Sequence, residues 1–225
     1  MITLQRCGNG VVLAFTDAEW DVGDVFEEEV ALVRDAVPSR RAEFLTVRHC
    51  ARQALHAIGH GRRAILPGSD RAPMWPDDVH GSLTHCHGMR AAAVVSADHA
   101  RSVGLDAEPW EPIPGDILDL VASPEEQDRL GARFLSGVGG RLIFSAKEAA
   151  FKAMHTLGTT AMEPHELFVD LDAASIAVDL SSNGSFVVTH VDTGLRVCGV
   201  WDQRSDTLMT FVRVPAEPLP SRIAG

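Results

Sequence analysis

The sequence predicts an α+β protein of two lobes, each a small antiparallel sheet packed with helices. Both halves of the chain combine helical patterns with short apolar segments typical of strands. After residue 165 the chain alternates apolar and polar residues between turn residues, as an antiparallel meander does. With 225 residues and 45% hydrophobic content, the chain can bury one sizeable core or two small cores that share an interface. We expect residues 1–103 to form the N-terminal lobe and residues 104–225 the C-terminal lobe.

Up to residue 108 the chain is expected to contain, in order, a strand, a long helix, a loop and two further strands: 11–15, 38–58, 66–81, 91–97 and 102–108. Apolar residues recur at helical spacing after Pro38, and Gly59 ends the pattern. The loop is rich in proline and glycine. A short DHAR link joins the last two strands and predicts that they pair as a hairpin.

The second lobe is expected to contain two helices and five strands: 123–135, 145–157, 166–170, 175–179, 185–191, 195–202 and 207–213. Ser123 precedes Pro124 and stands three residues before Glu126, which is the pattern of a capped helix start. Asn183-Gly184 and the sequence Asp192-Thr193-Gly194 predict turns between strands.

Composition excludes several classes of protein. The net charge of −11 argues against nucleic-acid binding, because a binding face must neutralise phosphates with Lys and Arg. No run approaches the roughly 20 apolar residues of a membrane helix, and the N-terminus lacks the order of a secretory signal, so a cytoplasmic location is expected. The four cysteines, which we expect to be reduced and mostly buried, are scattered without CxxC spacing and suggest neither a disulfide framework nor a thiolate zinc site.

The two lysines of the chain, Lys147 and Lys152, lie in one motif. A genome that favours arginine codons explains why lysine is scarce but not where it occurs. The alternative is that the chain uses arginine for most of its positive charge and keeps lysine for a specific task. The two explanations carry equal weight.

Asp106 and Glu108 stand two apart at the end of an apolar strand, so both side chains lie on one face. Two neighbouring carboxylates repel each other unless a cation lies between them, and Mg²⁺ prefers such hard oxygen ligands together with substrate phosphates. The alternative is a strand end at which solvated acids begin a loop. For an isolated motif of this kind, that alternative is the commoner one.

The segment IFSAKEAAFKA at 143–153 predicts a helix on which Glu148 and Lys152, four apart, share a face. A structural interpretation is available, because Ser145 with Glu148 forms a capping-box pattern and Glu148 with Lys152 a favourable ion pair. That interpretation leaves the adjacent Lys147 unexplained.

Two further polar groups are candidates for anion binding. His80, His85 and His87 cluster in HGSLTHCHG without a recognisable zinc spacing, and the small and hydroxyl residues before His85, among them Thr84, favour a phosphate contact. On the long helix, arginines 40, 41, 48 and 52 recur on related turns with a single acid, Glu43, so a multiply charged anion is a plausible partner and a solvated face is the alternative.

Taken together, the motifs resemble the surfactin-synthetase-type 4′-phosphopantetheinyl transferases, most closely their siderophore-associated branch, which is typified by enterobactin synthase component D. The resemblance is carried by five segments in order: RRAEFLTVR (40–48), RAPMWP (71–76), GSLTHC (81–86), SVGLDAEP (102–109) and RLIFSAKEAAFKA (141–153). It implies a monomer of two pseudo-symmetric lobes that transfers the phosphopantetheine arm of coenzyme A to a serine of an apo acyl, peptidyl or aryl carrier protein.

The resemblance also implies a role for each matching residue. Asp106, Glu108 and Glu148 would hold Mg²⁺, with Mn²⁺ as an alternative ion. The coenzyme A-binding residues implied are Arg40, Arg48, Arg71, Met74, Thr84, His85, Asp106, Lys147 and Lys152. Glu148 and Lys152 are the expected catalytic residues, Glu148 as the base for the carrier serine and Lys152 as a cation on the transferring phosphate. Trp75 could flank the adenine, with core packing as the alternative.

Carriers are typically acidic, and so is this chain, so long-range charge cannot be the main attraction. A local apolar patch is the alternative, and the segment 110–125 offers Trp110, Ile113, Ile117 and Leu118, which could equally pack in the core. Two rival functions share the same carboxylates: a Mg²⁺-dependent phosphoanhydride hydrolase, and a coenzyme A-binding module without catalysis.

Overall fold

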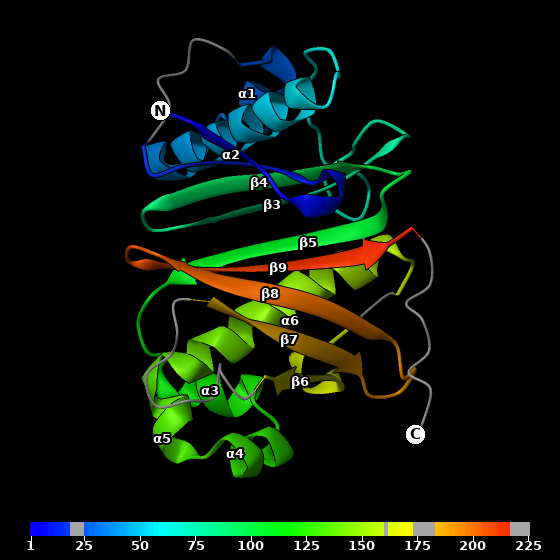
Figure 1. Cartoon of the computed structure of the whole chain (residues 1–225). Coiled ribbons are helices and arrows are strands. Elements are labelled where there is room, and N and C mark those ends of the chain that lie inside the picture. The colour runs from blue at the N-terminus through cyan, green and yellow to red at the C-terminus, as the bar shows by residue number, and fades with distance from the viewer. Residues whose placement is uncertain (19–24, 160–161, 173–182, 217–225) are drawn as a thin grey trace.

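The computed structural model describes residues 1–18, 25–159, 162–172 and 183–216, which form two antiparallel sheets with helices (Figure 1), so the α+β expectation is confirmed. The first sheet has the order β1 (Thr3–Arg6), β2 (Val12–Thr16), β4 (Met89–Ser96), β3 (Val79–Cys86). The second has the order β5 (Ala100–Pro109), β9 (Thr207–Pro215), β8 (Arg196–Arg204), β7 (Asn183–His190), β6 (Leu167–Leu171). The division expected between residues 103 and 104 falls inside β5, and the chain passes from one sheet to the other at residues 97–99.

The first sheet is covered by helices on one face (Figure 1). These are a short helix α1 (Glu27–Leu32) and the long helix α2 (Pro38–Ala57), and a 3₁₀ turn η1 (Gly8–Gly10) links β1 to β2. The predicted helix of this lobe is confirmed as α2. Pro38 occupies its first turn, and Gly59 follows its end with φ of +94°, a conformation that glycine adopts without strain. Small residues on α2, including Ala51 and Ala54, pack on β2 and β4.

The predicted hairpin of 91–97 and 102–108 is wrong, because the two segments are β4 and β5 and belong to different sheets. Both edges of β4 are taken, by β2 on one side and by β3 on the other, so β5 cannot pair with it. The predicted loop at 66–81 overlaps β3, which begins at Val79. Strand β3 was missed because its segment, VHGSLTHC, carries histidines and a glycine in place of β-branched alternation.

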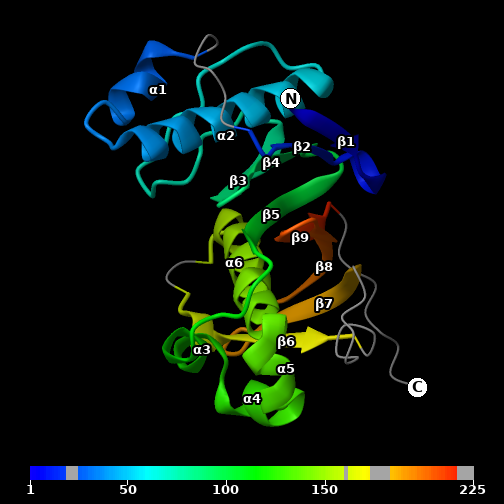
Figure 2. The same ribbon diagram turned by 90° about the vertical axis from the view of Figure 1, so that its left-hand side faces the viewer.

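Side-chain hydroxyls join the two sheets where β3 and β5 lie side by side (Figure 2). The Ser82 hydroxyl accepts a hydrogen bond from the Leu105 amide at 3.0 Å, and the Thr84 hydroxyl accepts one from the Ala107 amide at 3.0 Å. These two bonds satisfy amides that an edge strand would otherwise leave unpaired. The first lobe is therefore tied to the strand that carries Asp106 and Glu108.

After β5, the described part of the second lobe continues with the helical segments α3 (Gly115–Val121), α4 (Pro124–Leu130), α5 (Ala132–Phe134), a π-helical turn η2 (Leu135–Gly139) and α6 (Gly140–Thr156). The capping box of Ser123 and Glu126 is confirmed. The helix that it starts ends at Leu130 rather than near 135, because Gly131 has φ of +80°. Helix α6 begins five residues before the expected Ser145.

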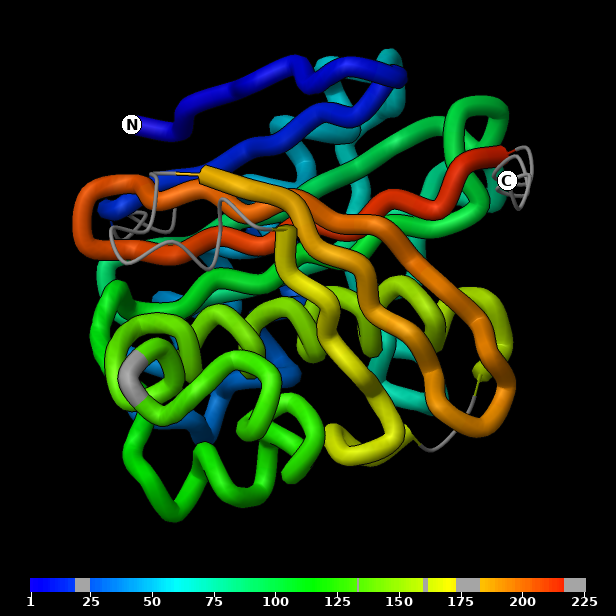
Figure 3. Tube along the Cα trace, turned by 60° about the horizontal axis from the view of Figure 1, so that its bottom comes forward, coloured from blue at the N-terminus to red at the C-terminus, as the bar shows by residue number. Residues whose placement is uncertain are grey.

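The expected meander is confirmed in β7, β8 and β9, with β6 on the far side of β7 (Figure 3). A short 3₁₀ turn, η3 (Pro164–Glu166), precedes β6. The turn at Asp192-Thr193-Gly194 joins β7 to β8, and its glycine has φ of +68°. The turn predicted at Asn183-Gly184 is wrong, since both residues pair with β8 inside β7. The strand predicted at 175–179 lies outside the described residues.

Helix α6 packs directly on β5 and β9 (Figure 2). The contact is closest at Gly104 of β5, where an added Cβ would collide with the backbone carbonyl of Ala149. The facing side of the helix consists mostly of alanines, including Ala146 and Ala153, which are fully buried. The Ser102 hydroxyl of β5 donates to the Ala153 carbonyl at 2.6 Å. Glycine and alanine thus allow an approach that larger side chains would prevent.

We predict that Gly104→Ala destabilises the protein by about 3 kcal/mol or more, since the obstructing atom is backbone and cannot rotate away. Gly115→Ala is the matched control, because its Cβ would meet nothing within 4 Å and its φ is not positive. Urea unfolding of both variants measures the effect. Equal stability of the two variants would contradict the close contact.

Candidate functional site

The Asp106 carboxylate forms the centre of a polar cluster between β3, β5 and α6. Its Oδ1 accepts hydrogen bonds from the Lys152 ammonium at 2.6 Å and from the Thr84 hydroxyl at 3.3 Å. Its Oδ2 accepts one from the Ser145 hydroxyl at 2.8 Å. Asp106 is only 5% exposed, whereas the Lys152 side chain retains 27% of its surface. A buried carboxylate with a partly open cation beside it is suited to meet a charged ligand at the surface.

Local sequence patterns account for this arrangement. Asp106 and Glu108 alternate with Ala107 along β5, so both carboxylates point away from the apolar face. On α6, Ser145, Glu148 and Lys152 stand three and four residues apart and share one side of the helix. The capping box considered for Ser145 and Glu148 is wrong, because Ser145 lies in the second turn of α6 and donates to Asp106 instead.

The other two predicted metal-binding carboxylates are near this centre but are directed differently. Glu108 accepts a hydrogen bond from Arg141 at 2.9 Å. Burial, together with the charge of Asp106, raises the pKa of Glu108 to about 7. Burial also raises the pKa of Glu148, with Lys152 opposing the shift and Asp106 adding to it. The three carboxylates are thus electrostatically coupled.

The donor set of these three carboxylates fits a hard divalent cation. Carboxylates that are costly to ionise beside one another are stabilised by an added positive charge. Within the described residues, however, no three such side chains are gathered closely enough to enclose an ion. Arg141 holds Glu108 in the arrangement seen here, so metal binding by all three carboxylates requires that this contact rearrange.

On the first lobe, Arg40 of α2 and His85 of β3 form a second polar group. The Arg40 guanidinium lies 2.7 Å from His85 Nε2, and Glu43 Oε2 lies 3.4 Å from the same nitrogen. A guanidinium has no acceptor, so Nε2 must accept and His85 is neutral in this contact. Burial lowers the pKa of His85, which is consistent with that state. Arg40 is exposed and available to an anion.

The arginines of α2 do not form one anion-binding face. The buried Arg48 donates to the Ile65 carbonyl at 2.8 Å and stacks on the Phe44 ring, and burial lowers its pKa to about 10. Arg52 is buried against Glu29 of α1, with both carboxylate oxygens within 2.8 Å. The sequence pattern missed Glu29 as a partner because it lies on another helix. Of the arginines on this helix, the structure leaves Arg40 as the one nearest His85.

Arg71 and Met74 lie on the loop between α2 and β3, and both are exposed. Arg71 has φ of +69° in a turn that the Gly68 and Ala72 backbone closes. Asp70 of the same turn contacts His155 of α6 at 2.9 Å, so the loop reaches across to the second lobe. Trp75 packs on Gly81 and on the apolar residues between α2 and the first sheet, which agrees with core packing rather than adenine contact.

Lys147 does not join Asp106 and Lys152 in this structure. Its ammonium lies 2.7 Å from Glu126 and also donates to the Val121 and Pro164 carbonyls. The side chains of Lys147 and Glu126 are 3% and 0% exposed. Five residues separate the two lysines, which places them roughly 140° apart around the helix. Burial accordingly lowers the pKa of Lys147, and Glu126 opposes the shift.

Segment 110–125 divides between the core and the surface. Ile113 is buried, and Leu118 packs on the hydrophobic core of the second lobe. Trp110 stacks on Trp201 of that core with ring centroids 6.1 Å apart. Ile117 and Leu120 of α3 are 40% and 74% exposed. Three of the four predicted docking residues therefore pack in the core, and Leu120 joins Ile117 on the surface.

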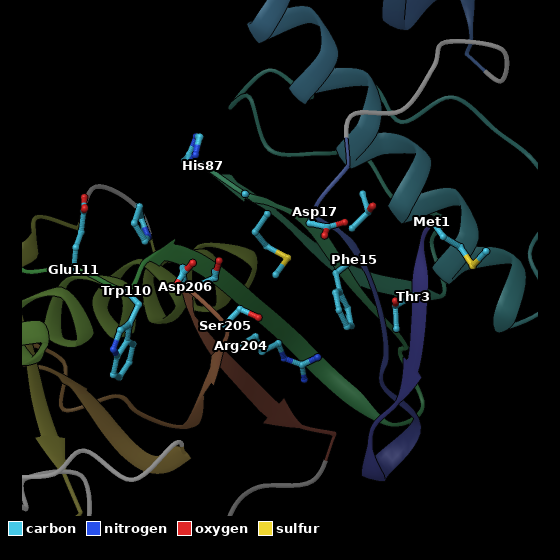
Figure 4. A pocket seen from close by; sticks show the side chains of 15 residues that line it. Met1, Thr3, Phe15, Asp17, His87, Trp110, Glu111, Arg204, Ser205 and Asp206 are labelled. Carbon is cyan, nitrogen blue, oxygen red and sulfur yellow. The ribbon is translucent and has the colours of Figure 1, made fainter.

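Two cavities of about 690 Å³ are lined by residues other than those of the polar centre. One is formed between the ends of β2 and β5 and the turn between β8 and β9, with Phe15, Trp110 and Arg204 in its walls (Figure 4). The other is lined by Leu105, whose side chain alternates with that of Asp106 along β5. We assign the chemistry to the polar centre, because these cavities contain none of its carboxylates or lysines.

Other properties of the chain are less specific. Cys50 is buried, Cys7 and Cys86 are partly buried, and Cys198 is exposed, so the expectation of mostly buried thiols holds only in part. Among the described helices, none has the length and apolar character required to cross a membrane.

Sequence reasoning missed several polar partners. The position of Ser145 three residues before Glu148 places it on the same side of the helix, but the same spacing also matches a capping box. Thr210 of β9 contacts Ser145, and Arg141 contacts Glu108; neither partner is close in sequence. Glu43 of α2 lies near His85 of β3, a partner that its place in the sequence does not indicate.

Comparison with known families agrees with this two-lobed arrangement. Residues 28–95 match the 4′-phosphopantetheinyl transferase N-terminal domain, and residues 102–208 match the 4′-phosphopantetheinyl transferase superfamily. The chain therefore belongs to the 4′-phosphopantetheinyl transferase family.

Comparison with individual proteins gives the same family. The chain is 48% identical over 170 residues to 4′-phosphopantetheinyl transferase Svp of Streptomyces mobaraensis, a match that covers 74% of this chain and 66% of Svp. It is 40% identical to 4′-phosphopantetheinyl transferase Npt of Nocardia iowensis, over 70% of this chain and 71% of Npt. Identity to enterobactin synthase component D of Escherichia coli is 33%, over 60% and 68% of the two chains. The expected family is confirmed, while these identities do not single out the siderophore-associated branch. The chain thus spans just under two thirds of the length of Svp.

We predict that Lys147→Ala lowers the free energy of unfolding by about 3–5 kcal/mol, because it leaves the Glu126 carboxylate buried without its cation. Arg129→Ala is the control, since the Arg129 pair with Asp170 is exposed and should contribute less than about 1 kcal/mol. Denaturant unfolding measures both. If Lys147→Ala instead kept full stability and raised the KM for coenzyme A, Lys147 would be a ligand contact as the resemblance implies.

Proposed function

We propose that this protein transfers the 4′-phosphopantetheine arm of coenzyme A to a serine of an apo acyl, peptidyl or aryl carrier protein and releases 3′,5′-ADP. The observation that carries the proposal is the Asp106–Lys152 pair, 2.6 Å apart, at the junction of the two lobes with Glu148 beside it. Membership in the family supports the same reaction. The relatives Svp and Npt are named as 4′-phosphopantetheinyl transferases.

Coenzyme A would lie across the junction of the lobes. Arg40 and His85 are suited to phosphate oxygens, because a phosphate can replace the contact that they make with each other. Arg71 and Met74 are exposed on the loop that Asp70 ties to α6, where they could meet the nucleotide end. Arg48 would act indirectly, by fixing the Ile65 end of that loop.

Lys152 is suited to the transferring phosphate. An ammonium has three donors, and two of them are used by Asp106 and by the Leu105 carbonyl. The third donor and the 27% exposure of the side chain leave Lys152 able to bind a phosphate oxygen. Its positive charge would neutralise negative charge that develops on the pyrophosphate.

The proposed step is an in-line displacement. The carrier serine Oγ forms a bond to the β-phosphorus of coenzyme A, the bond from that phosphorus to the bridging oxygen breaks, and 3′,5′-ADP leaves. The serine proton passes to Glu148, whose raised pKa makes it a better proton acceptor than an exposed glutamate. Asp106, Glu108 and Glu148 would hold Mg²⁺ or Mn²⁺, which when bound supplies positive charge to the pyrophosphate.

The α3 surface formed by Ile117 and Leu120 is the proposed carrier contact. It lies close to the polar centre, because Arg141 links Glu108 to the Glu111 and Pro112 carbonyls just before α3. An apolar contact also suits an acidic enzyme and an acidic carrier, which gain nothing from long-range attraction.

We predict that the purified protein, with coenzyme A and Mg²⁺, adds one phosphopantetheine mass to an apo-carrier. Lys152→Ala and Glu148→Gln should each slow the transfer at least about 100-fold. Arg129→Ala is the control and should keep the wild-type rate, because the exposed Arg129 side chain pairs with Asp170 of β6. Mass spectrometry of a carrier panel measures the product. Release of nucleotide without a change in carrier mass would indicate a phosphoanhydride hydrolase, and binding without turnover a coenzyme A-binding module.

We predict that Ile117→Asp raises the KM for the carrier about tenfold or more and leaves the KM for coenzyme A unchanged. Leu32→Asp is the matched control, because Leu32 is an exposed apolar residue on a helix of the other lobe. Steady-state kinetics with each substrate varied in turn distinguishes the two. An unchanged carrier KM in a folded Ile117→Asp variant would remove α3 from the docking surface.

A further inference from the structure

A chain of buried hydroxyls stands behind Asp106 on the side away from Lys152. Ser145 of α6 donates to Asp106 Oδ2 at 2.8 Å, and the Thr210 hydroxyl of β9 lies 2.8 Å from the Ser145 hydroxyl. Ser145 and Thr210 are both fully buried. Buried hydroxyls require hydrogen-bond partners, so this pair is fixed in place.

The hydrogens in this chain have one consistent arrangement. Asp106 pairs with the Lys152 ammonium and therefore only accepts, so Ser145 must give its single hydrogen to Oδ2. The Ser145 oxygen can then only accept from Thr210. The Thr210 hydrogen is shared between that oxygen and the Ser145 backbone carbonyl, which is 2.8 Å away. A hydroxyl that accepts in this way becomes a stronger donor, so the bonds strengthen one another.

Counting hydrogen bonds in the same way shows how many acceptor positions of the Asp106 carboxylate remain open. A carboxylate has about four acceptor positions. Within the described residues, Lys152 and Thr84 use two on Oδ1, and Ser145 uses one on Oδ2. The remaining position is on Oδ2, the oxygen that Ser145 holds.

We infer that Ser145 and Thr210 are positioning residues, which orient Asp106 so that Oδ2 is the single oxygen it presents to a divalent cation. This inference rests on the proposed function and assigns roles to two residues that touch neither substrate. Residues hydrogen-bonded to a metal ligand fix its direction and raise its affinity for the metal. Ser145→Ala would leave Oδ2 free to rotate away while Lys152 keeps hold of Oδ1.

The chain provides a matched control in Ser102. Ser102 and Ser145 are both fully buried serines at the β5–α6 contact, and each donates one short hydrogen bond across it. Ser102 donates to the Ala153 carbonyl and not to Asp106. Replacement of either serine by alanine removes the same atom and one hydrogen bond donated across the contact, and Ser145→Ala also removes the hydroxyl that Thr210 contacts, so the unfolding free energy of both variants is measured beside the titration. Only Ser145→Ala should change the metal site.

The experiment is a calorimetric titration of Mg²⁺ into enzyme saturated with coenzyme A and without carrier, so that no turnover occurs. Ser145→Ala should weaken Mg²⁺ binding about tenfold or more, whereas Ser102→Ala should bind like wild type. Thr210→Val should weaken binding less than Ser145→Ala does, and Thr210→Ser, which keeps the hydroxyl, should restore it. The double variant Ser145→Ala/Thr210→Val should be no weaker than Ser145→Ala alone, because Thr210 acts through Ser145.

Several results would overturn the inference. Wild-type Mg²⁺ affinity in a folded Ser145→Ala variant would do so, as would equal losses in Ser145→Ala and Ser102→Ala, which would indicate general destabilisation. If Ser145→Ala does not fold, unchanged affinity in Thr210→Val has the same consequence. If the wild-type complex does not bind Mg²⁺, both the metal site of the proposed function and this inference are rejected. If the wild type and Ser145→Ala bind Mg²⁺ equally well, only this inference is rejected.

Discussion

The close contact between α6 and β5 at Gly104 is the constraint on which the polar centre depends. With no side chain at Gly104, the helix backbone approaches the strand until the Ala149 carbonyl occupies the space of a Cβ. The hydrogen bonds from Ser145 and Lys152 to Asp106 all cross this contact. A separation larger by the width of a methyl group would exceed hydrogen-bond range for the short serine side chain, although the longer lysine could still reach. The geometry of Asp106 is therefore set by backbone packing rather than by side-chain flexibility.

A second constraint connects the lobes. Thr84 accepts from the Ala107 amide and donates to Asp106, so one hydroxyl both joins the sheets and supports the carboxylate. His85 is the next residue along β3, and it faces Arg40 of α2. The position of Arg40 and His85 relative to the acidic centre is thus set by the contact between β3 and β5. A ligand that spans the two groups would meet a preformed distance, which lowers the cost of ordering the site on binding.

Features that depend on the periodicity of a single strand or helix could be predicted from the sequence, whereas features that depend on packing between distant segments could not. Asp106 and Glu108 share a face because a strand has a period of two, and Glu148 and Lys152 share a face because a helix has a period of 3.6. Lys147 was misjudged because adjacency in sequence is not adjacency on a helix, and its partner Glu126 is brought close only by the packing of α4. The β4–β5 hairpin was wrong because strand pairing depends on which edges remain free. Strand β3 was missed because its segment carries histidines and a glycine in place of β-branched alternation.

The balance of charge separates structural from functional ion pairs in this fold. Arg52 with Glu29 and Lys147 with Glu126 are buried pairs of one cation and one anion, and each is further bonded to backbone groups of neighbouring elements. Such pairs hold helices together and have no charge left to offer a ligand. Among the described residues of the polar centre, three coupled carboxylates face two cations, Lys152 and Arg141, and burial raises the pKa of two of the three. The excess negative charge is a cost that the free protein bears and that a bound cation would relieve. On the proposed function, the same cation would allow a doubly charged pyrophosphate to approach acids that would otherwise repel it, so the metal ion and coenzyme A would bind together more favourably than either would alone.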